Sequence, residues 1–299
     1  MFWGGFFYMV GRGSNVRRIA ALAAAGWLLS SAGAIAAGPA VSSAQGAKLV
    51  DPAGAASLLS HRAVYTMALS KISESDGVRA ASGTMTYTLT DRCDGYTIET
   101  DLSLSLSFAN GNENQVEQRY AAWEAKDGKS STFRFQVVEN GTIAKAYHGD
   151  IHFKDDGTGT ANYDDGEVQT FDLPRGTLLS TAHTLALLKS AAAREKFVSK
   201  MVIDGSFDQG PLWVTATIAP PHEGGVLAVK GDSGTMTGGQ YWPVGLAYFP
   251  ASSSQATPEY EITQNILGSG ITRSMLQDFG GFTLSFTPVR VEAVAKPPC

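Results

Sequence analysis

The sequence predicts a single all-β domain of antiparallel strands, with one main α-helix and one disulfide. Three observations favour this fold class. Short segments of alternating apolar and polar residues recur from Arg62 onward, turn signals separate them, and the chain carries only two cysteines behind an apparent export signal.

The first 37 residues are typical of a secretory signal peptide. Three arginines between residues 12 and 18 precede the apolar stretch 19–29, which is too short to span a bilayer comfortably. Small residues follow, and we expect cleavage after Ala36 or Ala37. An uncleaved anchor is the alternative, and Met9 is an alternative start. The expected location is therefore an oxidising compartment of the cell envelope.

Cleavage would leave a flexible segment over residues 38–60 and a β domain over residues 61–299. The removed part holds three Arg and no acid, so the net charge moves from −5 to −8 for the remaining 262 residues. An acidic domain without clustered Lys and Arg argues against nucleic acid as the partner. A length near 260 residues suits one all-β barrel.

The two cysteines, Cys93 and Cys299, are expected to pair, because an exported chain with an even number of cysteines meets an oxidising compartment. Two free thiols would require a reducing compartment. The pairing would hold the last residue of the chain against its first third.

The first strands show which face is buried. In the segment 62–70, Tyr65, Met67 and Leu69 share one face, and this face is the better candidate for the core. The segments 83–90 and 96–108 repeat the alternation. We expect the three strands to be neighbours.

Turns are marked by Asn and Asp followed by Gly. Asn140-Gly141 predicts a hairpin between residues 133–138 and 143–147, because both residues tolerate positive φ. The turn also explains Asn140-Gly141-Thr142 without glycosylation of this sequon. Two Asp-Asp-Gly runs, at 155–157 and 164–166, predict further turns. Their spacing lacks the twelve-residue pattern of a calcium loop.

A helix is expected over Ala182–Glu195, with Ser180 or Thr181 as N-cap. Its predicted core stripe follows helical spacing and consists of Leu185, Leu188 and Ala192. Such a helix would pack on a sheet or plug the mouth of a barrel. Strands then resume at 197–203, 212–218, 240–249, 260–266 and 282–289, with loops at 220–239 and 251–258.

Catalytic patterns are weak. Thr181-Ala182-His183 and Gly231-Asp232-Ser233-Gly234 resemble the His and Ser boxes of chymotrypsin-like proteases, but only 50 residues separate His183 from Ser233, too few for that two-barrel fold. No nucleophile elbow, phosphate-binding loop, dinucleotide fingerprint or CxxC occurs in the chain. We therefore expect a protein that is not an enzyme and has no cofactor.

Metal and ligand sites are also sparse. His148 and His152 stand four residues apart on what reads as a turn, so they would not share a helical face as a zinc pair does, and no metal site is predicted. A group of aromatic residues could line a ligand pocket, although such residues are more often core. The candidate lining residues are Tyr241, Trp242, Tyr248 and Phe249.

The chain resembles the EipB family of cell-envelope-integrity proteins, long described as a domain of unknown function. The resemblance rests on short blocks in the same order over residues 61–299. The blocks are His61-Arg62-Ala63-Val64-Tyr65, Gly83-Thr84-Met85, Cys93-Asp94-Gly95-Tyr96, Leu173-Pro174-Arg175-Gly176, Thr181-Ala182-His183, Asp204-Gly205-Ser206, Trp242-Pro243-Val244, Ala247-Tyr248-Phe249-Pro250, Pro258-Glu259-Tyr260-Glu261 and Asp278-Phe279-Gly280-Gly281-Phe282. The chain departs from the pattern at Leu179-Ser180, where the resemblance leads us to expect Phe-Pro, and at Gly281, where it leads us to expect an acid.

The resemblance implies a periplasmic β-spiral, an incomplete barrel of antiparallel strands with a helix, closed by a disulfide placed like Cys93–Cys299. It implies a role in envelope integrity and stress resistance without known catalysis, and a tetratricopeptide-repeat protein as a functional partner. Our leading hypothesis is a non-enzymatic protein that binds a protein or envelope component through the concave face or rim of the open barrel. The alternative is a carrier of a lipid or other apolar ligand in a half-open barrel. Exposed strand edges are also compatible with a homodimer.

Overall fold

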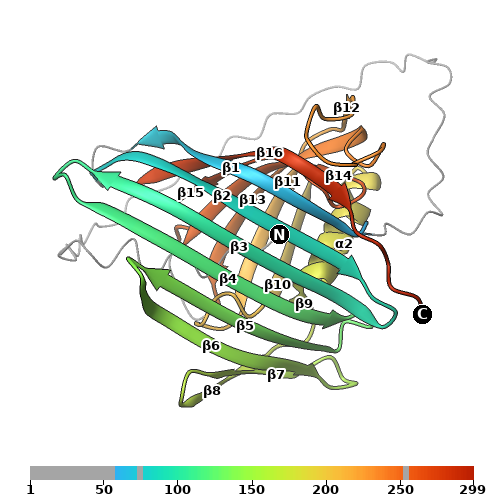
Figure 1. The fold of residues 1–299 in the computed structure, drawn as a ribbon. Coiled ribbons are helices and arrows are strands. Elements are labelled where there is room, and N and C mark those ends of the chain that lie inside the picture. The colour runs from blue at the N-terminus through green and yellow to red at the C-terminus, as the bar shows by residue number, and fades with distance from the viewer. Residues whose placement is uncertain (1–57, 73–76, 252–255) are drawn as a thin grey trace, which may run out of the picture. The chain divides into compact units, whose positions relative to one another are not determined.

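The structure is a computed structural model of the full chain, and it describes residues 58–72, 77–251 and 256–299. The signal peptide, its cleavage site and most of the expected flexible segment lie outside these residues. Sixteen strands and one helix make up the described part (Figure 1). The strands are β1 (His61–Ile72), β2 (Val78–Asp91), β3 (Gly95–Phe108), β4 (Glu113–Ala125), β5 (Ser130–Glu139), β6 (Thr142–Phe153), β7 (Gly159–Asp164), β8 (Val168–Leu173), β9 (Leu178–Leu179), β10 (Phe197–Ile203), β11 (Leu212–Ile218), β12 (His222–Gly224), β13 (Gly239–Pro250), β14 (Tyr260–Leu267), β15 (Thr272–Asp278) and β16 (Phe282–Ala293), and the helix is α2 (Ser180–Ala192).

All strands belong to one sheet. Its two edge strands, β8 and β9, follow each other in the middle of the chain, and the first and last strands, β1 and β16, pair at the centre of the sheet. The order is β8-β7-β6-β5-β4-β3-β2-β1-β16-β15-β14-β13-β11-β10-β9, with β12 paired to β13. Every pair is antiparallel except β9 with β10. The two end strands, β8 and β9, do not pair with each other, so the sheet stays open and forms an incomplete barrel. This confirms the predicted fold class.

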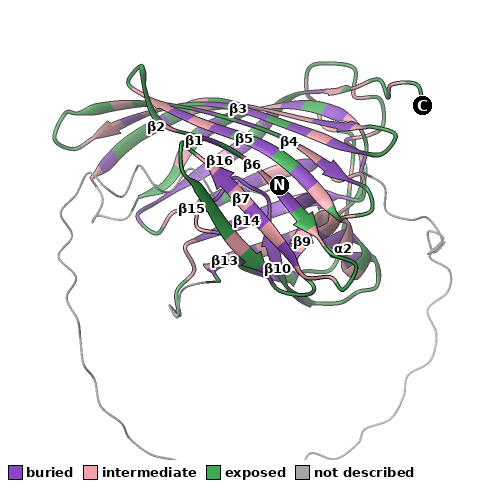
Figure 2. Cartoon of the chain, turned by 90° about the horizontal axis from the view of Figure 1, so that it is seen from below, coloured by how far each residue is buried: buried purple, intermediate pink, exposed green. Residues whose placement is uncertain are grey.

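The strands form two runs, β1–β8 and β9–β16. These runs face each other across the core, with α2 at one end of the sheet (Figure 1). Tyr65 on β1 reaches past its neighbour β16 and donates its hydroxyl proton to the carbonyl of Thr272 on β15, at 3.1 Å. Buried and exposed residues alternate along the strands (Figure 2). Tyr65 and Met67 are buried, as predicted, while Leu69 on the same face is only partly buried.

Local turn chemistry agrees with the predictions. Asn140 and Gly141 have φ values of 49° and 79° and join β5 to β6. These left-handed conformations match the twist of the flanking strands, which is why Asn-Gly is favoured there. The two Asp-Asp-Gly runs form the turns on either side of β7. The neighbours β1, β2 and β3 also pair as expected.

The helix differs from its prediction. It begins at Ser180 and ends at Ala192, and its N-cap position, Leu179, offers no side-chain cap. The expected cap residues are themselves helical, because a carboxylate from β4 takes the place of a local cap, as described below. The buried face consists of Ser180, Thr181, His183, Leu187, Leu188 and Ala191, whereas Leu185 is partly buried and Ala192 exposed. The predicted stripe is confirmed at Leu188 and wrong at Leu185 and Ala192, because the helix buries polar as well as apolar residues.

Three further predictions need correction. His148 and His152 do not lie in a turn, since both are within β6. The predicted loop 220–239 contains the short strand β12, which pairs with β13. Strand β15, for which no strand was predicted, fills the space between β14 and β16. No helix in the described part of the chain combines the length and the apolar character needed to cross a bilayer.

Candidate functional site

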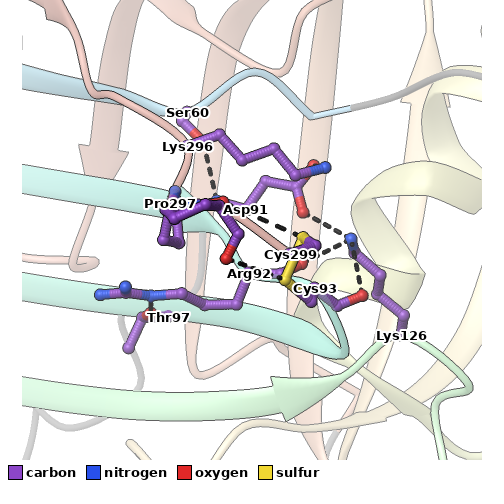
Figure 3. A network of polar contacts seen from close by, with 10 residues as sticks. Ser60, Asp91, Arg92, Cys93, Thr97, Lys126, Lys296, Pro297 and Cys299 are labelled. Atoms are coloured by element: carbon purple, nitrogen blue, oxygen red, sulfur yellow. Dashed lines mark hydrogen bonds and ion pairs between the residues drawn. A yellow bond between two sulfur atoms is a disulfide. The ribbon is translucent and has the colours of Figure 1, made fainter.

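The predicted disulfide is present and forms a C-terminal clamp (Figure 3). Cys93, in the turn between β2 and β3, bonds to Cys299 across 206 residues, with 5.5 Å between the two Cα atoms. Asp91 lies beside it and pairs with Lys126 at 2.5 Å and with Lys296 at 3.1 Å. Partial burial opposes ionisation, but the two ammonium groups hold the pKa of Asp91 below its ordinary value. Ion pairs and disulfide together fasten the C-terminal segment to the ends of β2 and β4.

A buried carboxylate holds the start of the helix. Glu124 on β4 has no exposed surface. It accepts hydrogen bonds from the Ser180 hydroxyl at 2.6 Å, from the Thr181 backbone N–H at 2.8 Å and from the Thr181 hydroxyl at 2.5 Å. A carboxylate at a helix N-terminus satisfies free N–H groups and interacts favourably with the helix dipole. Glu124 therefore caps α2 from a strand 56 residues away in sequence.

A second buried acid shapes the loop after β10. One carboxylate oxygen of Asp204 accepts the backbone N–H and the hydroxyl of Ser206, both at 2.8 Å. The Tyr120 hydroxyl on β4 donates to the Asp204 carbonyl. Burial raises the pKa of Asp204 to about 6, against the lowering effect of the Ser206 hydrogen bonds. This loop thus closes over β4 from the opposite half of the sheet.

The same loop covers an aromatic wall. Phe133, Tyr147 and Tyr163 pack together on the inner face of β5–β7, with ring centroids 4.8 to 6.3 Å apart. Gly205 lies directly on the Phe133 ring, since a Cβ atom there would be 2.3 Å from it, and its φ of 80° also requires glycine. The interior next to the helix is consequently filled. Its cavity, lined partly by Tyr120, holds about 30 Å³, compared with the roughly 300 Å³ at which small-molecule pockets begin.

The predicted ligand-lining aromatics divide between the two faces of β13. Trp242 and Tyr248 are buried, and Tyr248 stacks on Tyr260 with centroids 4.2 Å apart. Tyr241 is partly exposed and stacks on the imidazole of His222 at 5.5 Å. Phe249 is partly exposed as well. The structure does not bring the four side chains together, and their role in ligand binding stays a prediction.

Large hollows lie instead on the solvent-facing side of β3–β8. Two adjoining hollows, of about 730 and 950 Å³, share four lining residues: Ala121, Arg134, His148 and Asp164. We call the two hollows together the outer groove. Register brings the four residues into one row, with Ala121 opposite Arg134, Arg134 opposite His148, and His148 opposite Asp164. The small side chain of Ala121 leaves space in this row, between Arg119 and Trp123 on the same strand.

Some of the charged side chains of the outer groove form ion pairs. Arg119 lies 3.9 Å from Asp101 and 3.8 Å from Glu117, and His148 lies 3.8 Å from Asp164. Arg134, at the centre, forms no ion pair or side-chain hydrogen bond with any residue that the structure describes. Its guanidinium group, which carries five N–H donors, is available to a bound molecule.

Comparisons with known proteins agree with this architecture. The family model described as EipB-like matches residues 52–294. The chain belongs to this family. A curated relative, the cell envelope integrity protein EipB of Brucella abortus (strain 2308), is 27% identical over 246 residues, which cover 80% of this chain and 86% of the relative. A crystal structure of a beta-barrel-like protein of a domain of unknown function, also from Brucella abortus, matches with a TM-score of 0.72 and 25% identity, over 80% of this chain and 99% of that one.

Two of the sequence blocks on which the resemblance is based have structural roles. Cys93-Asp94-Gly95-Tyr96 forms the turn of the C-terminal clamp, and Asp204-Gly205-Ser206 forms the loop over the aromatic wall. Both blocks fix elements that are far apart in the sequence. The outer groove was not predicted. Its only local signal is that Arg119, Ala121 and Trp123 alternate on one face of β4.

The other residues considered for chemistry lie apart from the groove or on its rim. The His183 side chain is buried in the first turn of α2, and burial lowers its pKa to about 3. Ser233 belongs to the loop that runs beside β16, where Lys230 bridges to Arg290. His152 is exposed on β6, 3.4 Å from Asp150. No cluster of three or more metal-ligating side chains occurs within the described residues.

Proposed function

We propose that this protein is a non-catalytic periplasmic factor that supports the integrity of the cell envelope, and that the outer groove holds the envelope component or partner protein through which it acts. The name of the curated relative supports the role in the envelope. One observation carries the choice of surface. The outer groove offers hollows of about 730 and 950 Å³, whereas the interior cavity next to α2 holds about 30 Å³.

The alternative of a lipid carrier would require the barrel to open. An apolar ligand would have to displace the loop that packs on Phe133 and separate α2 from Glu124. Native mass spectrometry on protein isolated gently from its own envelope distinguishes the two functions. We expect the mass of the bare chain or of a complex with another chain, and a retained lipid mass would favour the carrier.

The groove can be tested by complementation in the native host. A strain lacking the gene should become sensitive to detergents, and the wild-type gene should restore its resistance. We expect Arg134→Glu to fail at the same periplasmic protein level, because a carboxylate cannot donate the hydrogen bonds that the guanidinium group offers to a bound molecule. Arg62→Glu is the matched control. Arg62 is a solvent-exposed arginine of the same sheet, on β1, outside the groove. Full resistance with Arg134→Glu would refute the assignment of the groove.

A further inference from the structure

A tryptophan platform forms one end of the larger hollow. Trp123 on β4 lies over Gly95 of β3, and a Cβ atom on this glycine would be 2.5 Å from the indole Nε1 and 2.7 Å from Cε2. The glycine therefore lets the indole lie against the sheet while the ring still lines the groove. Large aromatic faces of this kind bind flat, partly apolar rings.

A row of polar side chains leads away from this platform across four more strands. Register places Thr132, Asp150, Asn162 and Thr170 in line with Trp123. The Asn162 amide donates to the Asp150 carboxylate at 3.1 Å, and the Thr170 hydroxyl donates to the Asn162 carbonyl at 2.9 Å. Strands lie about 4.8 Å apart, so the row extends over about 19 Å. The row thus presents fixed donors and acceptors to an extended molecule.

The charge of the groove limits what this molecule can be. Its lining includes five carboxylates, from Glu99, Asp101, Asp150, Asp164 and Asp165, but only two guanidinium groups, from Arg119 and Arg134. This excess of negative charge disfavours nucleic acids, anionic lipid surfaces and acidic polymers. Hydroxyl groups, by contrast, can donate to carboxylates and accept from a guanidinium group.

The lining also contains few large apolar side chains. Apart from Trp123, the solvent-facing residues of the larger hollow include only Val168 as an exposed large hydrophobic. The buried centre of a protein–protein interface is usually apolar and depleted in charged residues. A single aromatic platform followed by planar polar groups fits a chain of sugar rings better.

We propose that the outer groove binds an uncharged glycan chain, with one sugar ring stacked on Trp123 and the following hydroxyl or acetamido groups bonded to Asp150, Asn162 and Arg134. This inference rests on the proposed function, because it names the ligand class of the same groove. The protein would then act on the envelope by holding a neutral polysaccharide strand.

The test is a titration of the purified protein with an N-acetylglucosamine hexamer and with a β-1,3-glucose hexamer, followed by calorimetry and tryptophan fluorescence. We expect saturable binding of at least one of these neutral hexamers, and at least tenfold weaker binding of polygalacturonate, an acidic polymer. Trp123→Ala should weaken binding at least tenfold. Trp213→Ala is the matched control, since Trp213 is 46% exposed on β11, outside the groove, and binding should be unchanged.

A second variant, Asp150→Ala, guards against a folding defect in Trp123→Ala, and it should weaken binding at least fivefold while the melting temperature stays within a few degrees of wild type. Absence of binding by either neutral hexamer, or stronger binding of the acidic polymer, would overturn the proposal. Unchanged affinity in both groove variants would do so as well. If Arg134→Glu still failed in complementation under any of these outcomes, the groove would keep its function and its occupant would not be a neutral glycan.

Discussion

Replacing Glu124 by Ala should destabilise the whole domain, because this carboxylate is the cap of α2. Among the residues that the structure describes, Glu124 is the acceptor for the Ser180 hydroxyl, the Thr181 N–H and the Thr181 hydroxyl, all within 2.5 to 2.8 Å, and the substitution removes it. The helix carries no side-chain cap of its own that could replace it. The site is fully buried, so bulk water does not reach it without a structural change.

The magnitude follows from the three donors. A buried donor left without an acceptor costs about 1–3 kcal/mol, but the two hydroxyls can rotate toward other acceptors, whereas the backbone N–H cannot. Loss of a helix cap alone costs about 0.5–2 kcal/mol. Adding the cavity left by the side chain, we expect Glu124→Ala to lower the free energy of unfolding by about 3–5 kcal/mol. Glu124→Gln keeps the shape and one acceptor, so it should lower this energy by about 1–3 kcal/mol.

The assay is urea unfolding of the oxidised protein at pH 7, followed by circular dichroism and tryptophan fluorescence. Glu117→Ala on the same strand is the control. Its side chain is 56% exposed, so its effect should stay within about 0.5 kcal/mol. A value for Glu124→Ala within about 0.5 kcal/mol of wild type, or a larger loss for Gln than for Ala, would refute the capping role.

Two further predictions concern the clamp and the second buried acid. Replacing both Cys93 and Cys299 by Ser should lower the free energy of unfolding in urea by up to about 5 kcal/mol, because the disulfide closes 206 residues of chain, and an unchanged midpoint would contradict the clamp. Burial raises the pKa of Asp204 to about 6 from the ordinary 3.8, so its carboxyl binds its proton more tightly in the folded chain. Its contribution to stability is therefore complete below about pH 4 and lost as the pH rises through about 6. The free energy of unfolding of wild type minus that of Asp204→Asn should fall by about 2 kcal/mol between pH 4 and pH 7, and a flat difference would show that the carboxyl is not buried as described.

The parts of the fold that could be predicted are those with a local signal. Asn140-Gly141 specifies its hairpin through two left-handed residues. The alternation of Tyr65 and Met67 indicates the buried face of β1, and the strands at 197–203 and 212–218 have the predicted bounds. In each case the residues that decide the structure are neighbours in the chain. The overall architecture needed the family resemblance, since strand order is not written in any single segment.

The parts that could not be predicted depend on residues far apart in sequence. The start of α2 is set by Glu124, which lies on β4, more than 50 residues earlier in the chain. The outer groove exists only because register aligns Ala121, Arg134 and His148 from three different strands. The aromatic residues of β13 looked alike in the sequence. Their alternation along the strand, however, sends neighbouring rings to opposite faces.

Strand β4 connects the interior of the domain to the outer groove. Its inward residues, Tyr120 and Glu124, hold the loop after β10 and the start of α2, while its outward residues, Arg119, Ala121 and Trp123, line the groove. A slip of this strand by one residue would send each set to the wrong face. The buried hydrogen bonds therefore oppose any slip that would disassemble the groove. The proposed binding surface is a polar sheet face, and it depends on the register of β4. This dependence explains why the chain retains buried acids, although burying a carboxylate is costly. The acids fix the register, and the register places the platform, the guanidinium group and the polar row in line.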